Sequence, residues 1–298
     1  MKLFYNIKLP LPPPHAPYAF GKNQFDEPWR TIIWSEPTQN LLRTLNGFQP
    51  GNLEVNTLRI LLHGPVGAGK SSFINSVDSC LRGLISTRAL PDAIGGESFT
   101  LGNVCVCFQC KTYKLRKDTP DSYYPFTFTD VMGLSGTDRS QTDNIIQILH
   151  GRIRNDYTVK DPWYNKNPSL KDKIHCLVSV LPADTVSLMK DDVIGQMRQV
   201  RKRARDLGIP QVIIMTKVDE ACPLVKANLK KVYTSKKIKE KMEECSVKLG
   251  VPMNCIFPVK NCHEEDANNT KIDILILKAV KQIVHFANDY VEDQEENE

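Results

Sequence analysis

A glycine-rich segment with the pattern Gly-x-x-x-x-Gly-Lys-Ser is the strongest chemical signal in the sequence. Glycines let a backbone wrap around an anion with its N–H groups pointing inward. In this pattern Lys70 reaches the β- and γ-phosphates of a nucleotide, and the hydroxyl of Ser71 coordinates Mg²⁺. The sequence therefore predicts a phosphate-binding loop, whose contacts we expect from Gly64, Gly67, Ala68, Gly69, Lys70, Ser71 and Ser72.

A second motif, Asp130-Val131-Met132-Gly133, directly follows a predicted strand. A carboxylate at the end of a core strand beside a phosphate loop can hold a Mg²⁺-bound water. The N–H of Gly133 can approach a γ-phosphate from the same place. The pattern Asp-x-x-Gly is common in turns, but here it follows the phosphate loop at the end of the right kind of strand. We therefore expect Asp130 and Gly133 at the nucleotide site.

A third motif, Thr216-Lys217-Val218-Asp219, indicates which base is bound. It resembles the [Asn/Thr]-Lys-x-Asp guanine-recognition motif of GTPases. The carboxylate of Asp219 can accept hydrogen bonds from N1–H and the 2-amino group of guanine, and adenine offers neither. Such a charge-assisted pair contributes about 2–3 kcal/mol, a discrimination of roughly 30- to 150-fold. The stem of Lys217 would cover the base. The alternative is an aspartate that only caps the next helix.

Two further parts of such a site are less clear in the sequence. A threonine that contacts the metal should lie between the first helix and the second strand, and Thr100 is the candidate. A base-side loop should follow the last strand, where residues 258–261 read Pro-Val-Lys-Asn and offer Lys260. The predicted metal ligands are then Ser71, Thr100 and Asp130, and the predicted base-side residues are Thr216, Lys217, Asp219 and Lys260.

Alternating apolar segments must position these motifs. Their periodicity predicts strands over 58–63, 104–114, 126–130, 174–181, 211–215 and 254–259. It predicts helices over 38–46, 70–81, 141–152, 191–207, 223–249 with a break near 234–235, and 272–291. Residues 153–173 read as an inserted loop. This alternation predicts an α/β class, a P-loop GTPase-like three-layer fold with a mainly parallel sheet and helices on both faces.

Composition changes near both ends of the chain. Residues 1–55 are rich in proline and aromatics and predict an N-terminal extension that packs on the main domain at 56–291. The proline cluster at 10–17 suits a rigid spacer, or a ligand for a proline-binding module. The acidic residues 292–298 predict a disordered tail.

Charge and cysteine content bound the class of protein. The net charge of +5 is mild and does not by itself imply a nucleic-acid or membrane partner. No apolar run approaches the length that spans a bilayer, and the nine cysteines, an odd number, suit reduced thiols, so we expect a cytoplasmic protein. The spacing Cys105-x-Cys107-x-x-Cys110 could suggest zinc, but no second pair matches it, and alternate positions in a strand are the simpler interpretation.

One predicted helix carries a row of positive charge. Its cations fall three and four residues apart, on one face: Arg198, Arg201, Lys202 and Arg205. Nucleic acid, an anionic membrane or an acidic partner could bind there, but we favour a merely solvated face.

With these motifs placed, the sequence resembles the interferon-induced protein 44 and 44-like family. The resemblance rests on the segments 25–30, 59–77, 130–134, 169–176 and 216–219, and it spans roughly residues 25–290. It implies a GTPase-like domain, a cytoplasmic location and a role in interferon-linked immune or antiviral responses. Several relatives carry a TLDc domain before this domain, and the chain is too short to include one. The three cysteines at 105, 107 and 110 depart from what the family leads us to expect.

The function predicted from these features is binding of GTP or GDP with Mg²⁺. Leu134 stands where many GTPases carry a water-orienting glutamine, so hydrolysis should be slow or should rely on a group from elsewhere. One hypothesis is a slow GTPase whose nucleotide state controls self-assembly or partner binding. The alternative is a nucleotide-binding interaction module without useful hydrolysis. A P-loop ATPase or kinase is disfavoured by the motif at 216–219.

Overall fold

A computed structural model of the protein describes residues 23–89, 110–117, 119, 121–136, 139–153, 164–262, 265 and 269–295. Predicted features outside these residues include the proline cluster at 10–17, Thr100, the pair Cys105 and Cys107, and the last three residues of the acidic segment. Residues 104–109 of the predicted strand and 154–163 of the predicted inserted loop also lie outside them.

One six-stranded sheet forms the centre of the described chain, with strand order β2-β3-β1-β4-β5-β6. Strand β2 pairs with β3 in antiparallel fashion, and every other pairing is parallel. The strands are β1 (Leu58–His63), β2 (Cys110–Arg116), β3 (Tyr123–Val131), β4 (Cys176–Pro182), β5 (Gln211–Thr216) and β6 (Ile256–Pro258). A mainly parallel sheet with this crossover order confirms the predicted α/β P-loop GTPase-like class.

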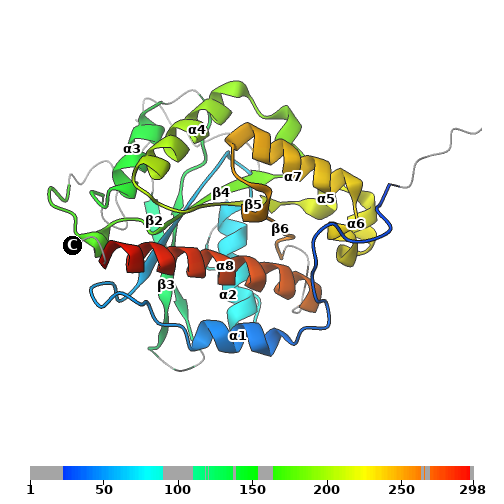
Figure 1. Ribbon diagram of the computed structural model, residues 1–298, viewed down its shortest axis with the longest axis horizontal. Helices are drawn as coiled ribbons and strands as arrows, with labels where there is room; N and C mark the ends of the chain where they lie inside the picture. The colour runs from blue at the N-terminus through cyan, green and yellow to red at the C-terminus, as the bar shows by residue number, and fades with distance from the viewer. Residues whose placement is uncertain are drawn as a thin grey trace, which may run out of the picture.

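Helices cover the sheet and explain its apolar strands. Along β4 every residue is buried, as expected for a strand covered on both faces. Figure 1 shows α8 and α2 together on one side of the sheet, with α1 packed on α8, and α3, α4 and α7 grouped on another side. The longer helices are α1 (Thr38–Asn46), α2 (Lys70–Arg82), α3 (Arg139–Leu149), α4 (Asp191–Asp206), α7 (Lys236–Leu249) and α8 (Thr270–Glu295).

Short helical turns fill several connections. They are η1 (Leu170–Asp172), η2 (Val186–Leu188), α5 (Val218–Ala221), α6 (Pro223–Ala227), η3 (Leu229–Tyr233) and η4 (Met253–Cys255). The helix predicted over 223–249 is therefore divided into α6, η3 and α7. Ser235 explains the predicted break, because its side chain accepts a hydrogen bond from the N–H of Ile238 and caps α7.

The last helix is longer than the sequence predicted. The expected disordered tail began at residue 292, but α8 continues to Glu295, and only 296–298 lie outside the described residues. Two contacts account for the extra turn. The amide of Asn52 donates to the carbonyl of Val291 at 2.9 Å, and that of Asn288 donates to Glu292 at 2.9 Å. The boundary predicted from acidic composition alone is corrected by these anchors.

Residues 23–36 lie against η3, η4 and the start of α7. The N–H groups of Phe25 and Trp29 donate to the carbonyls of Thr234 and Tyr233, at 2.7 and 3.1 Å. The rings of Trp29 and Tyr233 meet edge to face with centroids 5.2 Å apart. This segment therefore makes backbone and aromatic contacts with the connection that follows β5.

Candidate functional site

The predicted phosphate loop connects β1 to α2 at the carboxyl edge of the sheet. Gly64 passes so close to β4 that an added Cβ would lie 2.2 Å from the carbonyl oxygen of Val180. Gly69, with φ of 86°, starts α2 in a left-handed conformation that residues with a Cβ adopt at a cost. The amino end of α2, where the helix dipole and free N–H groups favour an anion, is thereby directed into the loop.

Two polar side chains meet beside this loop. The parallel register of β1 and β3 pairs Leu62 with Asp130, which brings the end of β3 next to the start of α2. There the hydroxyl of Ser71 donates to Asp130 Oδ2 at 2.5 Å. The predicted metal ligands Ser71 and Asp130 are thus adjacent, and oxygen donors of these kinds suit Mg²⁺.

Lys70 is held across the mouth of the loop. Its side chain is buried, and Nζ donates to the carbonyl of Pro65 at 3.2 Å. An ammonium in this position faces the space enclosed by the loop's backbone. The charge also acts on His63, which lies under the loop with Nε2 2.7 Å from the hydroxyl of Ser179. Burial, and then the nearby charge of Lys70, lower the pKa of His63 to about 3, so it is neutral and structural.

The loop after Asp130 is fastened to the phosphate loop. An added Cβ on Gly133 would lie 2.5 Å from Cα of Val66, so only glycine fits there. The N–H of Leu134 donates to the carbonyl of Gly64 at 3.0 Å, and the N–H of Val66 donates to Leu134 at 3.4 Å. The Leu134 side chain is buried and apolar, and it offers no group that could orient a water.

The third motif, residues 216–219, contributes one side chain that supports the phosphate loop and others that are candidates for recognising the base. The hydroxyl of Thr216 donates to the carbonyl of Ala68 at 2.7 Å, so Thr216 braces the phosphate loop. Lys217 has φ of 56°, and its Nζ lies 3.8 Å from the carboxylate of Asp184. Asp219 sits in the first turn of α5 with its side chain 20% exposed. Its carboxylate remains partly open to the solvent side of this edge.

The segment after β6 completes this edge of the sheet. Lys260 Nζ lies 4.0 Å from Asp219 and is hydrogen-bonded to Glu265. Burial alone would lower the pKa of Lys260, but the hydrogen bond and charge of Glu265, with the charge of Asp219, raise it. Lys260 is therefore a positively charged neighbour of the Asp219 carboxylate.

The sequence prediction missed Asn261 as a part of the site. Its amide donates to the carbonyl of Gly69 at 3.1 Å, which links the segment after β6 to the start of α2. The only sequence signal was its position directly after Lys260, at the end of a strand that had to reach the same edge.

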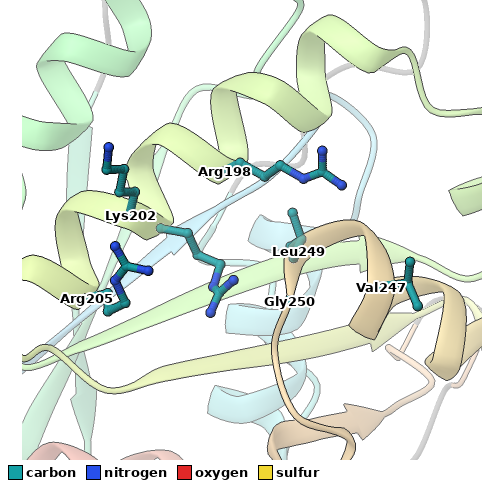
Figure 2. Close-up of a pocket in the computed structure, with 7 residues that line it drawn as sticks. Arg198, Lys202, Arg205, Val247, Leu249 and Gly250 are labelled. Atoms are coloured by element: carbon teal, nitrogen blue, oxygen red, sulfur yellow. The ribbon is translucent and has the colours of Figure 1, made fainter.

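The predicted basic face lies away from this site. Arg198, Lys202 and Arg205 extend from α4 beside a hollow of about 430 Å³, bordered on its other side by the end of α7 (Figure 2). Arg201, which also lines this hollow, is hydrogen-bonded to Gln211 at the first position of β5, whereas Thr216 is at the last. The two regions are therefore at opposite ends of β5, roughly 16 Å apart along the strand.

Two other expectations concern metals and membranes. The cysteines of the described residues form no disulfide, and Cys110 is buried in β2. No cluster of three or more His, Cys, Asp and Glu side chains is arranged for a metal within the described ranges. No described helix combines the length and apolar character that crossing a membrane requires.

Comparison with known proteins gives a consistent result. No protein-family profile matches the chain. It is 32% identical to human interferon-induced protein 44 over 267 residues, which is 87% of this chain and 58% of the relative. It is 30% identical to the mouse protein of that name over 85% of this chain and 60% of the relative. It is 29% identical to human interferon-induced protein 44-like over 91% of this chain and 61% of the relative.

These relatives confirm the resemblance predicted from the sequence, and the chain spans about three fifths of their length. Among solved structures, a crystal structure of Toc33 from Arabidopsis thaliana in complex with GDP and Mg²⁺ matches with a TM-score of 0.45 and 12% identity. That match covers 84% of this chain and 90% of the other.

Proposed function

We propose that this chain binds a guanine nucleotide, GTP or GDP, with Mg²⁺ at the carboxyl edge of its sheet. One observation carries the proposal: a phosphate loop, a hydroxyl–carboxylate pair and a base-reading carboxylate lie along one edge, on β1, β3 and β5. Each group alone has a structural explanation. Their order along the chain and their common edge together favour a single ligand with phosphate at one end and guanine at the other.

At the phosphate end, the backbone N–H groups of Gly67, Ala68 and Gly69 would surround the β-phosphate. Lys70 would neutralise phosphate charge, with Ser72 adding a hydroxyl in the first turn of α2. Ser71 would ligate Mg²⁺ directly, and Asp130, now 2.5 Å from Ser71, would accept from a metal-bound water. Bound Mg²⁺ would supply charge neutralisation on the phosphates. Thr100 is proposed as a further ligand from the segment before β2.

At the base end, Asp219 would accept hydrogen bonds from N1–H and the 2-amino group of guanine. Lys260, 4.0 Å away, places a positive charge beside that carboxylate. Lys217 would lie along the face of the base, as its neighbour Asp184 holds its ammonium to one side. Thr216 would act indirectly, through its hydrogen bond to Ala68.

Hydrolysis is proposed to be slow. The buried side chain of Leu134 replaces a water-orienting group, and its backbone is hydrogen-bonded to Gly64. In the first form of the proposal, nucleotide state controls self-assembly or partner binding of a cytoplasmic protein in an antiviral response. The names of its relatives supply the link to interferon. In the second form, the chain is a nucleotide-binding module without useful hydrolysis.

The assignment of guanine as the bound base can be tested by replacing one carboxylate oxygen of Asp219 with an amide nitrogen. Xanthine carries a carbonyl where guanine has its 2-amino group, so an amide in place of the Asp219 carboxylate should favour xanthine. Asp219→Asn should weaken GDP binding at least about tenfold and strengthen xanthosine diphosphate binding, the scale of one charge-assisted hydrogen bond. The control is Glu54→Gln, which changes an exposed carboxylate of the segment before β1. Unchanged base preference in Asp219→Asn would remove the proposed role.

A measurement of GTP turnover distinguishes the slow GTPase from the nucleotide-binding module without useful hydrolysis. The measurement is phosphate release from GTP at several protein concentrations. Turnover per molecule that rises with concentration supports assembly-linked hydrolysis, and binding without turnover at any concentration supports the module. Rapid single-turnover hydrolysis by the isolated monomer contradicts the inference from Leu134.

A further inference from the structure

The basic face of α4 forms one wall of a groove rather than a convex surface. A hollow of about 430 Å³ lies between the end of α7 and the cations of α4, which are Arg198, Arg201, Lys202 and Arg205. Figure 2 shows Arg198, Lys202 and Arg205 on α4 beside Val247, Leu249 and Gly250. A second hollow of about 340 Å³ continues along the loop that leads into β5. Arg201 and Arg205 border both hollows, so together they form one elongated groove, called here the α4–α7 groove.

The positive charge of this groove is not balanced by its surroundings. The residues that line the two hollows include no aspartate or glutamate. Over the described ranges, Arg198, Arg201 and Lys202 form no ion pair, and Arg205 contacts only its exposed neighbour Asp206, at 3.3 Å. Burial and the charge of Arg205 lower the pKa of Arg201. Like charges held together in a concavity raise the local positive potential and attract an anion.

Two of the arginines are fixed in a way that leaves their charged ends available. Arg198 Nε donates to the carbonyl of Lys248 at 2.6 Å, and Arg201 Nε donates to Gln211 at 2.6 Å. Each guanidinium carries further N–H donors beyond Nε. Anchoring through Nε reduces the entropy that the side chain would lose on binding a ligand. These contacts explain the positions of Arg198 and Arg201, but they do not explain Lys202 and Arg205.

The opposite wall of the groove is apolar and small. Val247 is 78% exposed, and Leu249, Ile209, Val251 and Pro252 line the remainder. Gly250 ends α7 with φ of 68°, and an added Cβ there would lie 3.0 Å from a terminal nitrogen of Arg201. Glycine therefore leaves space beside the Arg201 guanidinium.

We infer that the α4–α7 groove binds an acidic peptide segment of a partner protein. Along α4 the four cations extend over about 10 Å, which an extended peptide covers with three to four residues. Carboxylates on one side of such a peptide would meet the cations, while an aliphatic side chain on the other would rest on Val247. Arginine clusters that recognise acidic segments are a recurrent mode of peptide binding.

Other anionic partners fit this groove less well. Single-stranded nucleic acid is normally held by aromatic side chains on which bases stack, and none lines either hollow. A membrane surface would need the cations on a protruding face with apolar residues ready to insert. Here the cations border a recess, and Val247 is the single well-exposed large aliphatic residue lining it.

The test uses fluorescence anisotropy with the full chain and a fluorescein-labelled nonapeptide of three Glu-Glu-Leu repeats. The double variant Lys202→Gln, Arg205→Gln removes two exposed charges that make no core contacts. It should weaken peptide binding at least about tenfold, as loss of charge-assisted hydrogen bonds implies. The control is Lys237→Gln, Lys281→Gln, which removes the same charge from exposed positions outside the groove and should leave binding within twofold of the parent.

Additional probes distinguish an acidic peptide from other anionic partners of the groove. The same peptide with glutamine in place of glutamate should not bind. Tighter binding of a twelve-nucleotide RNA, or recruitment to phosphatidylserine vesicles that the groove variant abolishes, would overturn the peptide assignment. Equal sensitivity of both double variants would also overturn it, because it would indicate non-specific charge attraction. Lys70→Ala should keep peptide binding, so a failure of the proposed nucleotide function would leave this inference standing.

Discussion

The N–H of Leu134 donates to the carbonyl oxygen of Gly64 at 3.0 Å, which fastens the loop after β3 to the phosphate loop. Both residues belong to segments that would meet the phosphates of a nucleotide. A group bound in one segment would therefore be sensed in the other through this hydrogen bond and the one that Val66 donates to Leu134. Because Val66 and Gly133 pack together beside that contact, the junction leaves no space for a larger side chain at residue 133.

The first prediction concerns this junction. In Gly133→Ala the new methyl group would lie 2.5 Å from Cα of Val66, and backbone atoms cannot yield as a flexible side chain does. We expect a loss of about 1–3 kcal/mol in the free energy of unfolding, the usual cost of overpacking. Urea denaturation followed by circular dichroism measures it.

A second glycine supplies the control. At Gly195, in the middle of α4, an added Cβ meets nothing within 4 Å. Gly195→Ala should therefore stabilise the protein by about 0.5–1 kcal/mol, because alanine loses less entropy in a helix. Equal effects of the two substitutions would show that the contact between Gly133 and Val66 is not tight.

The second prediction concerns the brace between β5 and the phosphate loop. Thr216→Val keeps the side-chain shape but removes the hydroxyl that donates to Ala68 at 2.7 Å. The carbonyl of Ala68 then loses a buried partner, at a cost of about 1–3 kcal/mol. We expect GDP affinity to fall by about tenfold in isothermal titration, while Thr216→Ser, which keeps the hydroxyl, stays within threefold of the parent. Equal affinities for Val and Ser would contradict the brace.

The third prediction concerns the attachment of residues 23–36. The Arg30 guanidinium donates to the carbonyls of Ile256 and Met253, and it lies 5.3 Å and 5.5 Å from the ring centroids of Trp29 and Tyr233. Arg30→Ala should lower the free energy of unfolding by about 2–4 kcal/mol, because two carbonyls lose a charged donor.

Arg30→Lys should recover less than half of that loss, since an ammonium lacks the planar fork that reaches both carbonyls. The control Arg43→Ala changes an exposed arginine of α1 and should alter stability by less than about 0.5 kcal/mol. If Arg30→Ala is as mild as Arg43→Ala in thermal and urea unfolding, the segment is not held as described.

The fourth prediction concerns acid sensitivity. His175 is buried, and its pKa is lowered from 6.5 to about 4, chiefly by burial. The folded protein therefore holds the neutral ring, whereas the unfolded chain takes up a proton below pH 6.5. The contribution of His175 to stability is complete above that pH and is progressively lost as the pH falls towards 4. At pH 4.5 the loss in the free energy of unfolding reaches roughly 2–3 kcal/mol.

The corresponding measurement compares urea unfolding at pH 7 and pH 4.5 in the parent and in His175→Gln. The variant should be less stable at pH 7, because the ring accepts from the N–H of Arg59 and lies 3.0 Å from the carbonyl of Leu170. Its further loss between the two pH values should be smaller than the parent's by the amount given above. An identical pH dependence would show that His175 does not titrate with a lowered pKa.

Local sequence patterns predicted most of the fold because many helices and strands are determined by residues close together in the chain. The predicted strand over 58–63 is β1, and the predicted helix over 38–46 is α1, since each is set by apolar periodicity alone. Boundaries decided by distant contacts were predicted less well. The end of α8 was placed too early, and there the amide of Asn52 donates to Val291, a partner 239 residues away. The break before α7, which is set locally by the Ser235 cap on Ile238, was predicted near 234–235.

The candidate site shows the same difference between residues in local motifs and residues whose contacts are distant in the sequence. Lys70, Asp130 and Asp219 were predicted because each lies in a motif with fixed spacing. Asn261 was missed because its partner Gly69 is 192 residues away, and no local pattern encodes that contact. The supporting role of Thr216 was likewise invisible, since only the fold reveals which carbonyl its hydroxyl reaches.

The central claim is that Asp219 selects guanine at a phosphate site built around Lys70. The most direct measurement is equilibrium titration of the purified full chain with GDP and with ADP, in the presence of Mg²⁺. The account predicts GDP binding roughly 30- to 150-fold tighter than ADP, equivalent to about 2–3 kcal/mol, and loss of both in Lys70→Ala. Equal affinity for the two nucleotides, or GDP binding that survives Lys70→Ala unchanged, would contradict it.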